Sequence, residues 1–270
     1  MLTFLFWNLA KRDIGHIVSA LVLENKVDIL LLAESTLAPA NLLRMLNPTG
    51  SVRFNFVPPP RQTDTKIDIF FGFHQNFIQP KEDIRRATIR VVKLPGRTEF
   101  LLCGVHFQSA LVWNDESQAL ESARLNTTIR ETEKREGHTR TLVVGDLNMN
   151  PFALGVTSAS GFNAVMTREV ALRGTRRLSD EDHPFFFNPM WGHFGDGESG
   201  PAGTFYHNPN EYASIYWHML DQVLVRPELV PYFELPSLKI LTDYSAGPLI
   251  GQNGRPSASD HLPIIFKLNV

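Results

Sequence analysis

Short apolar runs, many of them bounded by turn residues, recur along the whole chain and constrain its fold more than any other feature. Their lengths and their content of β-branched and aromatic residues are typical of β-strands. The expected strands cover residues 2–9, 28–33, 51–57, 66–73, 84–94, 99–107, 141–145, 219–225 and 262–268. In the fourth run the apolar Ile67, Ile69 and Phe71 occupy alternate positions, which predicts a strand near the centre of a sheet.

Two segments have the pattern of helices. After Asp13, the expected N-cap, an apolar stripe at helical spacing predicts a helix that covers one face of a sheet. The stripe consists of Ile14, Ile17, Val18, Leu21 and Val22. A second helix is expected from Asp115 to Gly137, because Gln118 completes a capping-box arrangement and the glycine is a natural stop. Its apolar stripe is weaker, so we expect more of this helix to be exposed.

The order of these elements predicts an α/β fold. A strand, a helix and a strand open the chain, and the same order recurs around residues 115–137, with consecutive strands between. This arrangement favours two mixed β-sheets packed face to face with helices outside, a four-layer α/β sandwich. With 270 residues, of which 43% are hydrophobic, a single domain over residues 1–270 is expected. Residues 150–161, 184–209 and 245–259 are predicted to be loops, which at this length are usually functional.

Composition narrows the classes of function. The formal charge is −2, so a polyanion would have to be bound by a local basic patch or a metal ion. The segment MLTFLFWNLAKRD lacks the basic start of a signal peptide, and no uncharged apolar stretch reaches the roughly 18 residues of a membrane helix. The single cysteine, Cys103, is expected in the core and fits a reducing compartment. We therefore expect a soluble, cytoplasmic protein.

Polar residues stand where several expected strands end. Burying such groups costs free energy unless a ligand or a partner compensates. These residues are Asn8, Glu34, His106, Asp146 with Asn148, and Asp260 with His261. Taken alone, each has an ordinary explanation, because GDLN and SDH also suit turns and a lone histidine is more often a core residue. Asp146 and Asn148 are two positions apart, so on an extended backbone both side chains would reach one phosphate or water.

The joint pattern is more specific than any one of these residues. The blocks FWNL, LLLAES, GVHFQS, VVGDLN, LDQVLV and SDHLPI occur in this order across nearly the whole chain. In order and approximate spacing they resemble the six signature blocks of the endonuclease/exonuclease/phosphatase family, also called DNase I-like. The resemblance implies a duplicated β-sandwich with the site at one sheet edge. It also implies a divalent-metal-dependent phosphodiesterase, with nucleic acid as the expected substrate.

The resemblance implies one bound Mg²⁺ or Mn²⁺. Glu34, with Asn8 nearby, would hold this hard cation, which prefers oxygen ligands and keeps several waters. Asp260 would complete the metal shell, directly or through water. Ala10 stands where some family members carry a second acidic residue, so a second metal site is in doubt and a one-metal mechanism is favoured.

The resemblance also implies catalytic roles. Phosphodiester hydrolysis needs an aligned water, neutralised phosphoryl charge and a stabilised leaving oxygen. Asp146 would orient and deprotonate the attacking water, and the amide of Asn148 would donate to the scissile phosphate. His261 would contact a non-bridging phosphate oxygen, with Asp221 orienting the imidazole. His106 would donate to the phosphate or to the leaving oxygen.

Several functions remain open within and beyond this resemblance. The first is a nuclease; the second is a phosphatase acting on inositol phosphates or a phospholipid diesterase. The sequence MLDQ stands where inositol phosphatases carry a WCDR-like block, and the absence of a signal peptide argues against a secreted sphingomyelinase. A catalytically inactive binding module would lack metal or base residues, and none of the core set is missing. The aromatic segment GTFYH, residues 203–207, would stack bases, contact lipid or pack a loop.

Two adjacent loops are candidates for a basic rim that follows a nucleic-acid backbone. The basic residues are Arg61, Lys66, Lys81, Arg85 and Arg86. Acidic residues are interspersed among them, so an ordinary solvated surface is an equally simple explanation. Binding along such a rim would fall steeply with salt, because each phosphate contact releases counterions and this release becomes less favourable as the salt concentration rises.

Overall fold

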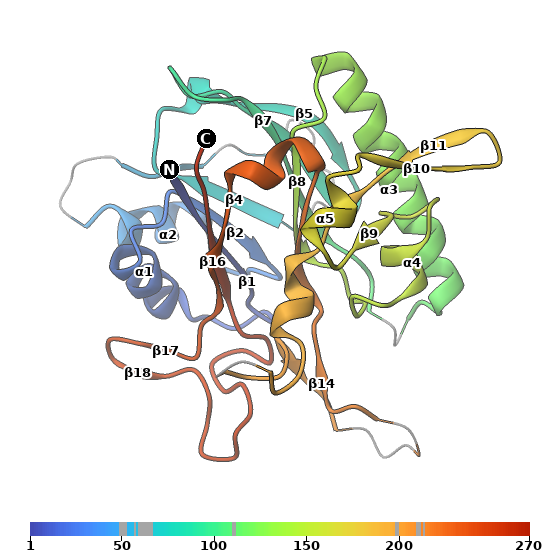
Figure 1. Cartoon of the computed structure of the whole chain (residues 1–270). Helices are drawn as coiled ribbons and strands as arrows, with labels where there is room; N and C mark the ends of the chain where they lie inside the picture. Colours follow the sequence, from blue (N-terminus) through green and yellow to red (C-terminus); the bar gives the residue numbers. More distant parts are fainter. Residues whose placement is uncertain are drawn as a thin grey trace.

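The computed structural model describes residues 1–48, 53–56, 58, 67–109, 112–197, 200–208, 212 and 214–270. Within these residues two mixed β-sheets pack face to face (Figure 1). Helices α1 and α2 lie against one outer face and α3 and α4 against the other. The predicted four-layer α/β sandwich is therefore confirmed.

Among the described residues, the first sheet has six strands in the order β16, β19, β1, β2, β4, β3. Their bounds are β1 (Leu2–Asn8), β2 (Ile29–Ala33), β3 (Asn55–Phe56), β4 (Ile67–Phe71), β16 (Phe233–Ile240) and β19 (Ile264–Leu268). Strands β1 and β2 are parallel, and the other neighbours are antiparallel. The expectation that β4 is central was wrong, because only the short β3 lies beyond it. Sheet packing on one side and helix packing on the other bury even a strand next to the edge.

The second sheet has seven strands in the order β5, β6, β7, β8, β15, β12, β9. Their bounds are β5 (Ile78–Ile84), β6 (Ala87–Val92), β7 (Phe100–His106), β8 (Thr141–Asp146), β9 (Ala164–Val165), β12 (Phe186–Phe187) and β15 (Asp221–Val225). Strands β7 and β8 are parallel, as are β9 and β12. The single strand expected over residues 84–94 is instead the end of one strand and the start of the next, because the chain reverses at a two-residue turn, Arg85–Arg86.

Smaller elements connect the sheets. The α-helices are α1 (Gly15–Glu24), α2 (Pro39–Leu46), α3 (Asp115–Glu136), α4 (Leu154–Thr157) and α5 (Arg168–Ala171). Short 3₁₀ helices are η1 (Gln75–Phe77), η2 (Pro189–His193) and η3 (Pro227–Tyr232). Three two-stranded ribbons are β10 (Thr175–Leu178) with β11 (Glu181–Pro184), β13 (Phe205–Tyr206) with β14 (Trp217–His218), and β17 (Asp243–Tyr244) with β18 (Gly247–Pro248). Parts of the segments expected to be loops therefore carry regular structure. No helix among the described residues has the length and apolar character needed to cross a membrane.

The helix ends differ from expectation at both N-termini. Helix α1 has Ile14 rather than Asp13 at its N-cap, and no side chain caps it. Helix α3 is capped one residue earlier than expected, by Asn114, whose side chain accepts a hydrogen bond from the Ser117 amide at 3.0 Å. The predicted stop holds, since Gly137 adopts a left-handed conformation with φ of 75°.

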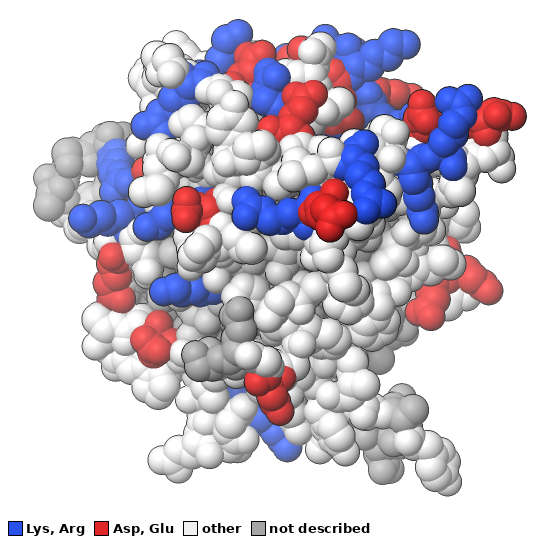
Figure 2. Space-filling view, in the orientation of Figure 1, with Lys and Arg blue, Asp and Glu red and all other residues white. Residues whose placement is uncertain are grey.

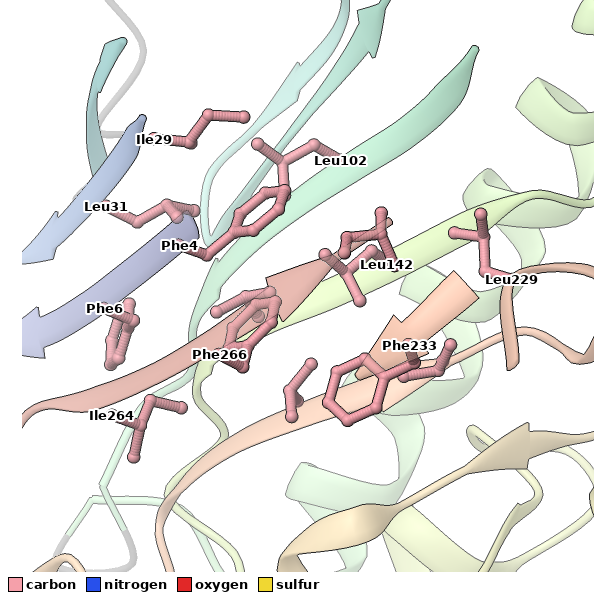
Figure 3. Packing of buried hydrophobic residues seen from close by; sticks show 14 of the residues in the cluster. Phe4, Phe6, Ile29, Leu31, Leu102, Leu142, Leu229, Phe233, Ile264 and Phe266 are labelled. Atoms are coloured by element: carbon pink, nitrogen blue, oxygen red, sulfur yellow. The ribbon is translucent and has the colours of Figure 1, made fainter. Parts of the chain in front are cut away.

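Three apolar clusters hold the layers together. The largest fills the space between the sheets, where Phe4 of β1 stacks on Phe266 of β19 with ring centroids 4.9 Å apart (Figure 3). Leu142 of β8 reaches the same cluster from the facing sheet. The other two clusters join each sheet to its outer helices. The predicted burial of Cys103 is confirmed, and the residue lies in the cluster beneath α3.

Candidate active site

The predicted site residues meet where strands of both sheets end. His106 ends β7 and Asp146 ends β8, and the two residues are in register because these strands are parallel. Strand β15 runs antiparallel to β8, so Asp221, its first residue, also pairs with Asp146. Asn8 ends β1 of the facing sheet, and its side-chain amide donates a hydrogen bond to the Asp146 carboxylate across the sandwich. The topology thus gathers polar groups that are far apart in the sequence at one end of the sandwich.

Gly145 has a structural reason to precede the aspartate of the GDLN block. A Cβ atom on this residue would lie 1.8 Å from the carbonyl oxygen of Val105 on β7. Only glycine therefore allows β7 and β8 to stay paired up to His106 and Asp146. The small residue is needed for strand pairing, and the pairing places the two polar side chains.

The carboxylate of Asp146 is buried and held by amide groups. Its Oδ2 accepts from Nδ2 of Asn8 at 2.9 Å and from Nδ2 of Asn148 at 3.0 Å, while Oδ1 accepts from the Asn148 backbone amide at 2.8 Å. Burial raises the pKa of Asp146 to about 6, although the nearby His261 opposes the shift. A carboxylate with its pKa in this range is well suited to accept a proton near neutral pH.

His261 forms a buried pair with Asp221. The imidazole Nδ1 lies 2.8 Å from Oδ2 of Asp221, and Nε2 lies 3.9 Å from Oδ2 of Asp146. Burial by itself lowers the pKa of His261, but Asp221 first and Asp146 next outweigh it and raise the pKa to about 10. The ring is therefore an imidazolium whose Nδ1–H donates to Asp221 and whose Nε2–H faces the site. Phe205 packs against the ring with centroids 4.7 Å apart.

His106 and Glu34 form the other side of the site. Nε2 of His106 lies 3.4 Å from Oε1 of Glu34 and 3.8 Å from Oδ2 of Asp146. Its Nδ1 is buried and has no hydrogen-bond partner among the described residues. The hydrogen bond from His106 lowers the pKa of Glu34 against the opposing effect of burial. Glu34 follows β2, and its backbone φ is 47°. This backbone conformation is uncommon for a residue other than glycine. It bends the chain at the end of the strand.

The described histidines and carboxylates bring one group of three donor atoms within 4.8 Å of one another: Asp146, Asp221 and His261. Two of these residues contact each other directly, because Nδ1 of His261 lies 2.8 Å from Oδ2 of Asp221. Asp146 lies opposite the other ring nitrogen, with Oδ2 3.9 Å from Nε2 of His261. We call these three residues the buried relay.

The residues predicted to hold Mg²⁺ or Mn²⁺ are arranged more loosely. The side chain of Glu34 is 28% exposed and ionised, and a single carboxylate with waters is a common way to bind Mg²⁺. Oδ1 of Asn8 accepts from the Ala10 amide at 3.0 Å and keeps a second lone pair. The Asp260 carboxylate is 51% exposed, with Oδ1 4.0 Å from Nε2 of His261. The ligand atoms of Glu34, Asn8 and Asp260 are all oxygens, and such a set fits a hard divalent cation. Among the described residues, however, Glu34 and Asp260 do not belong to one cluster of ligand atoms within 4.8 Å of one another.

The side chain of Asn148 is hydrogen-bonded within the protein. Its Nδ2 donates to the carbonyl oxygen of Phe107 at 2.9 Å as well as to Asp146 at 3.0 Å. Donation to the scissile phosphate, the predicted role, would therefore require one of these two hydrogen bonds to open. Asn148 also holds Asp146, because its own backbone, with φ of 50°, turns the side chain back toward β7 and β8.

Comparison with known proteins identifies the family. The sequence model of the Endonuclease/Exonuclease/phosphatase family matches residues 5–261. The chain belongs to this family. No curated protein matches it.

Solved structures share the family fold at low sequence identity. The endonuclease domain of TRAS1, a telomere-specific non-LTR retrotransposon, is 12% identical with a TM-score of 0.56, covering 100% of this chain and 99% of that chain. D. rerio TDP2 complexed with single strand DNA product is 14% identical, with a TM-score of 0.57 and coverage of 100% and 99%. The human Nocturnin catalytic domain with bound sulfate anion is 15% identical, with a TM-score of 0.54 and coverage of 98% and 93%. These likenesses support the fold assignment.

Two supporting residues within the family blocks were not singled out from the sequence. Trp7, which precedes Asn8 in FWNL, donates from Nε1 to the carbonyl oxygen of His261 at 2.9 Å. Ser259, which begins SDHLPI, donates from Oγ to the Asn8 carbonyl at 2.7 Å and accepts from the His261 amide at 3.2 Å. Both residues connect the first strand to the last block. Their position inside the FWNL and SDHLPI blocks is the sequence feature that could have identified them.

The predicted basic rim does not form from the described residues. Arg61 and Lys66 lie outside these residues. Arg86 is buried, donates to the Gln108 side chain and lies over the Trp113 ring, whereas Lys81 pairs with Glu136 at 2.9 Å. Arg85 is exposed at the β5–β6 turn. Most Lys and Arg in the view of Figure 2 lie in the upper half, interspersed with Asp and Glu.

Proposed function

We propose that this protein is a divalent-metal-dependent phosphodiesterase that hydrolyses nucleic acid, with residues 1–270 acting as one domain. The observation that carries the proposal is the buried relay at the strand ends, in which Asp146 faces an imidazolium held by Asp221. Such a pair combines a proton acceptor with a fixed positive donor. Family membership supports hydrolysis of a phosphoester. The buried free thiol of Cys103 favours a reducing compartment such as the cytoplasm.

In the proposed mechanism Asp146 accepts the proton of the attacking water. Asn8 and Asn148 fix the carboxylate from two sides, so its orientation does not depend on substrate. The Nε2–H of His261 donates to a non-bridging phosphate oxygen, and Asp221 keeps this imidazole oriented and charged.

Two further contributions complete the proposed reaction. His106 donates from Nε2, which faces Glu34 and Asp146, to the phosphate or the leaving oxygen. Glu34, with Asn8 and Asp260, would hold Mg²⁺ or Mn²⁺, which when bound neutralises charge on the phosphoryl oxygens. These roles keep the proton acceptor and the metal-binding carboxylate on separate residues.

Nucleic acid is the proposed substrate because two independent features favour it. Phe205 packs on His261, and an aromatic ring beside the reacting phosphate is suited to stack a base or sugar. Solved structures with the same fold include an endonuclease domain and a protein bound to single-stranded DNA. A panel of single- and double-stranded oligonucleotides, inositol phosphates and sphingomyelin with Mg²⁺ tests the proposal. Turnover of inositol phosphate or lipid alone would replace nucleic acid with that class.

We expect turnover to require a divalent ion and Glu34. Excess EDTA should abolish hydrolysis of bis(p-nitrophenyl) phosphate, and Mg²⁺ or Mn²⁺ should restore it, because charge on the phosphoryl oxygens must be neutralised. Glu34→Gln should weaken Mg²⁺ binding, measured by calorimetry, by at least about tenfold, since the amide is a neutral ligand. Glu99→Gln is the matched control, because Glu99 is similarly exposed but pairs with Lys93. Full activity in EDTA, or equal weakening by the control, contradicts this assignment.

Arg85 is expected to contact the substrate backbone. Arg85 lies in the β5–β6 turn, and the other residue of this turn is Arg86. The carbonyl oxygen of Arg86 accepts a hydrogen bond from the His106 amide at 2.9 Å, so the turn adjoins the site. Arg85→Ala in an Asp146→Asn background should lower the log–log salt slope of single-stranded oligonucleotide binding by about 0.7, one phosphate contact. The control Arg173→Ala removes another exposed arginine, which pairs with Glu169. An unchanged slope for Arg85→Ala would exclude this arginine from the binding surface.

A further inference from the structure

The two strands that carry His106 and Asp146 separate immediately beyond these residues. The last backbone bond of their ladder runs from the Phe107 amide to the Asp146 carbonyl at 2.9 Å. Among the described residues, no backbone amide donates to the carbonyl groups of Phe107 and Gln108 on one chain or of Asn148 on the other. A side chain that donates to both chains therefore helps to hold the two strand ends together.

Gln118 of α3 supplies one of these side chains. It was expected to complete a capping box, but its side chain turns inward and only 3% of the residue is exposed. Its Nε2 donates to the carbonyl oxygen of Asn148 at 2.8 Å and to that of Gln108 at 3.2 Å. One amide group therefore bridges the chain leaving β7 and the chain leaving β8.

The orientation of this amide follows from its partners. Exchanging the nitrogen and oxygen of Gln118 would place Oε1 against two carbonyl oxygens, which is repulsive. The shorter of its two hydrogen bonds goes to the carbonyl of Asn148, a residue with φ of 50°. The backbone amide and the side-chain amide of Asn148 donate to the two oxygens of Asp146. A continuous chain of hydrogen bonds thus leads from α3 to the carboxylate.

We propose that Gln118 is a positioning residue, which fixes Asn148 in its left-handed conformation and thereby aims the carboxylate of Asp146. The inference rests on the proposed hydrolysis, in which Asp146 accepts the proton of water. Without the bridge, Asn148 can relax toward a less strained backbone, and the carboxylate loses donors on both oxygens. A small misplacement of a proton acceptor lowers the rate of the chemical step more than it affects substrate binding.

The test compares two buried amides of the same helix. Gln118→Met keeps the volume and removes the bridge. The matched control is Asn126→Leu, because Asn126 is as buried as Gln118 but accepts from Arg226 at 3.3 Å, away from the site. With bis(p-nitrophenyl) phosphate and Mg²⁺, we expect Gln118→Met to lower kcat by about 10- to 100-fold with KM within about threefold. Asn126→Leu should keep kcat within about twofold even if its Tm falls equally.

A second measurement does not depend on activity. Hydrogen exchange of the Asn148 side-chain amide, followed by NMR on protein labelled with ¹⁵N-asparagine, should be at least about tenfold faster in Gln118→Met than in the wild type or Asn126→Leu. If the wild-type protein hydrolyses no phosphodiester, the proposed function fails and this exchange alone decides whether Gln118 holds Asn148. Unchanged exchange, unchanged kcat in an active enzyme, or an equal loss of kcat in Asn126→Leu overturns the inference.

Discussion

Replacing Asp146 with Asn is expected to lower kcat by about 10²- to 10⁴-fold, the usual contribution of a general base. The substitution keeps the shape of the side chain but removes its ability to accept a proton from water. KM should change little, because the phosphate is bound by other groups. Steady-state kinetics with bis(p-nitrophenyl) phosphate and with an oligonucleotide measure both constants.

A control is needed for the loss of a buried carboxylate. The side chain of Asp83 is also buried, and it pairs with Arg90 at 2.9 Å. Asp83→Asn should lower Tm without a comparable loss of kcat in the folded protein. Near-normal turnover by Asp146→Asn would show that another residue accepts the proton.

Replacing Arg226 with Met is expected to destabilise the fold by about 3 to 5 kcal/mol, because it leaves the charge of Glu133 buried and unpaired. Arg226 is completely buried, its Nε donates to Oε1 of Glu133 at 2.8 Å, and its guanidinium lies 3.8 Å from the centroid of the Phe186 ring. This residue joins α3 to β12 and β15. Urea denaturation gives the free energy of unfolding.

The double variant Arg226→Met with Glu133→Leu separates charge from packing. It should recover part of the loss, since no buried charge remains, but not all of it. Arg226 also donates to the carbonyls of Pro184 and Phe185, at 3.1 and 3.2 Å, and these would remain unsatisfied. Arg173→Ala, which breaks the exposed pair with Glu169, should cost at most about 1 kcal/mol. A double variant no more stable than the single one would refute the role of the unpaired charge.

The sequence by itself determined the α/β class and the positions at which polar residues follow strands. Strand periodicity and the two helical stripes are local patterns, so they predict β1, β2, β7, β8 and the helices α1 and α3 closely. The order of the family blocks predicted that Asn8, His106, Asp146, Asp221 and His261 lie together, and the structure shows that they do. Their chemical roles remain predictions that the variants above test.

Only the tertiary structure decided which donor and acceptor groups form hydrogen bonds with each other. Asn8 and Asp146 are 138 positions apart, and their hydrogen bond exists because two sheets pack face to face. Contacts around the second sheet turned Gln118 from an expected cap into a bridge, and took Arg86 from an expected basic rim into a buried contact. Residue type and spacing describe the donors and acceptors that a chain carries. The hydrogen-bond partner of each donor or acceptor lies on a segment that is distant in the sequence and shares no local pattern with it. This partner is therefore determined only when the layers pack together.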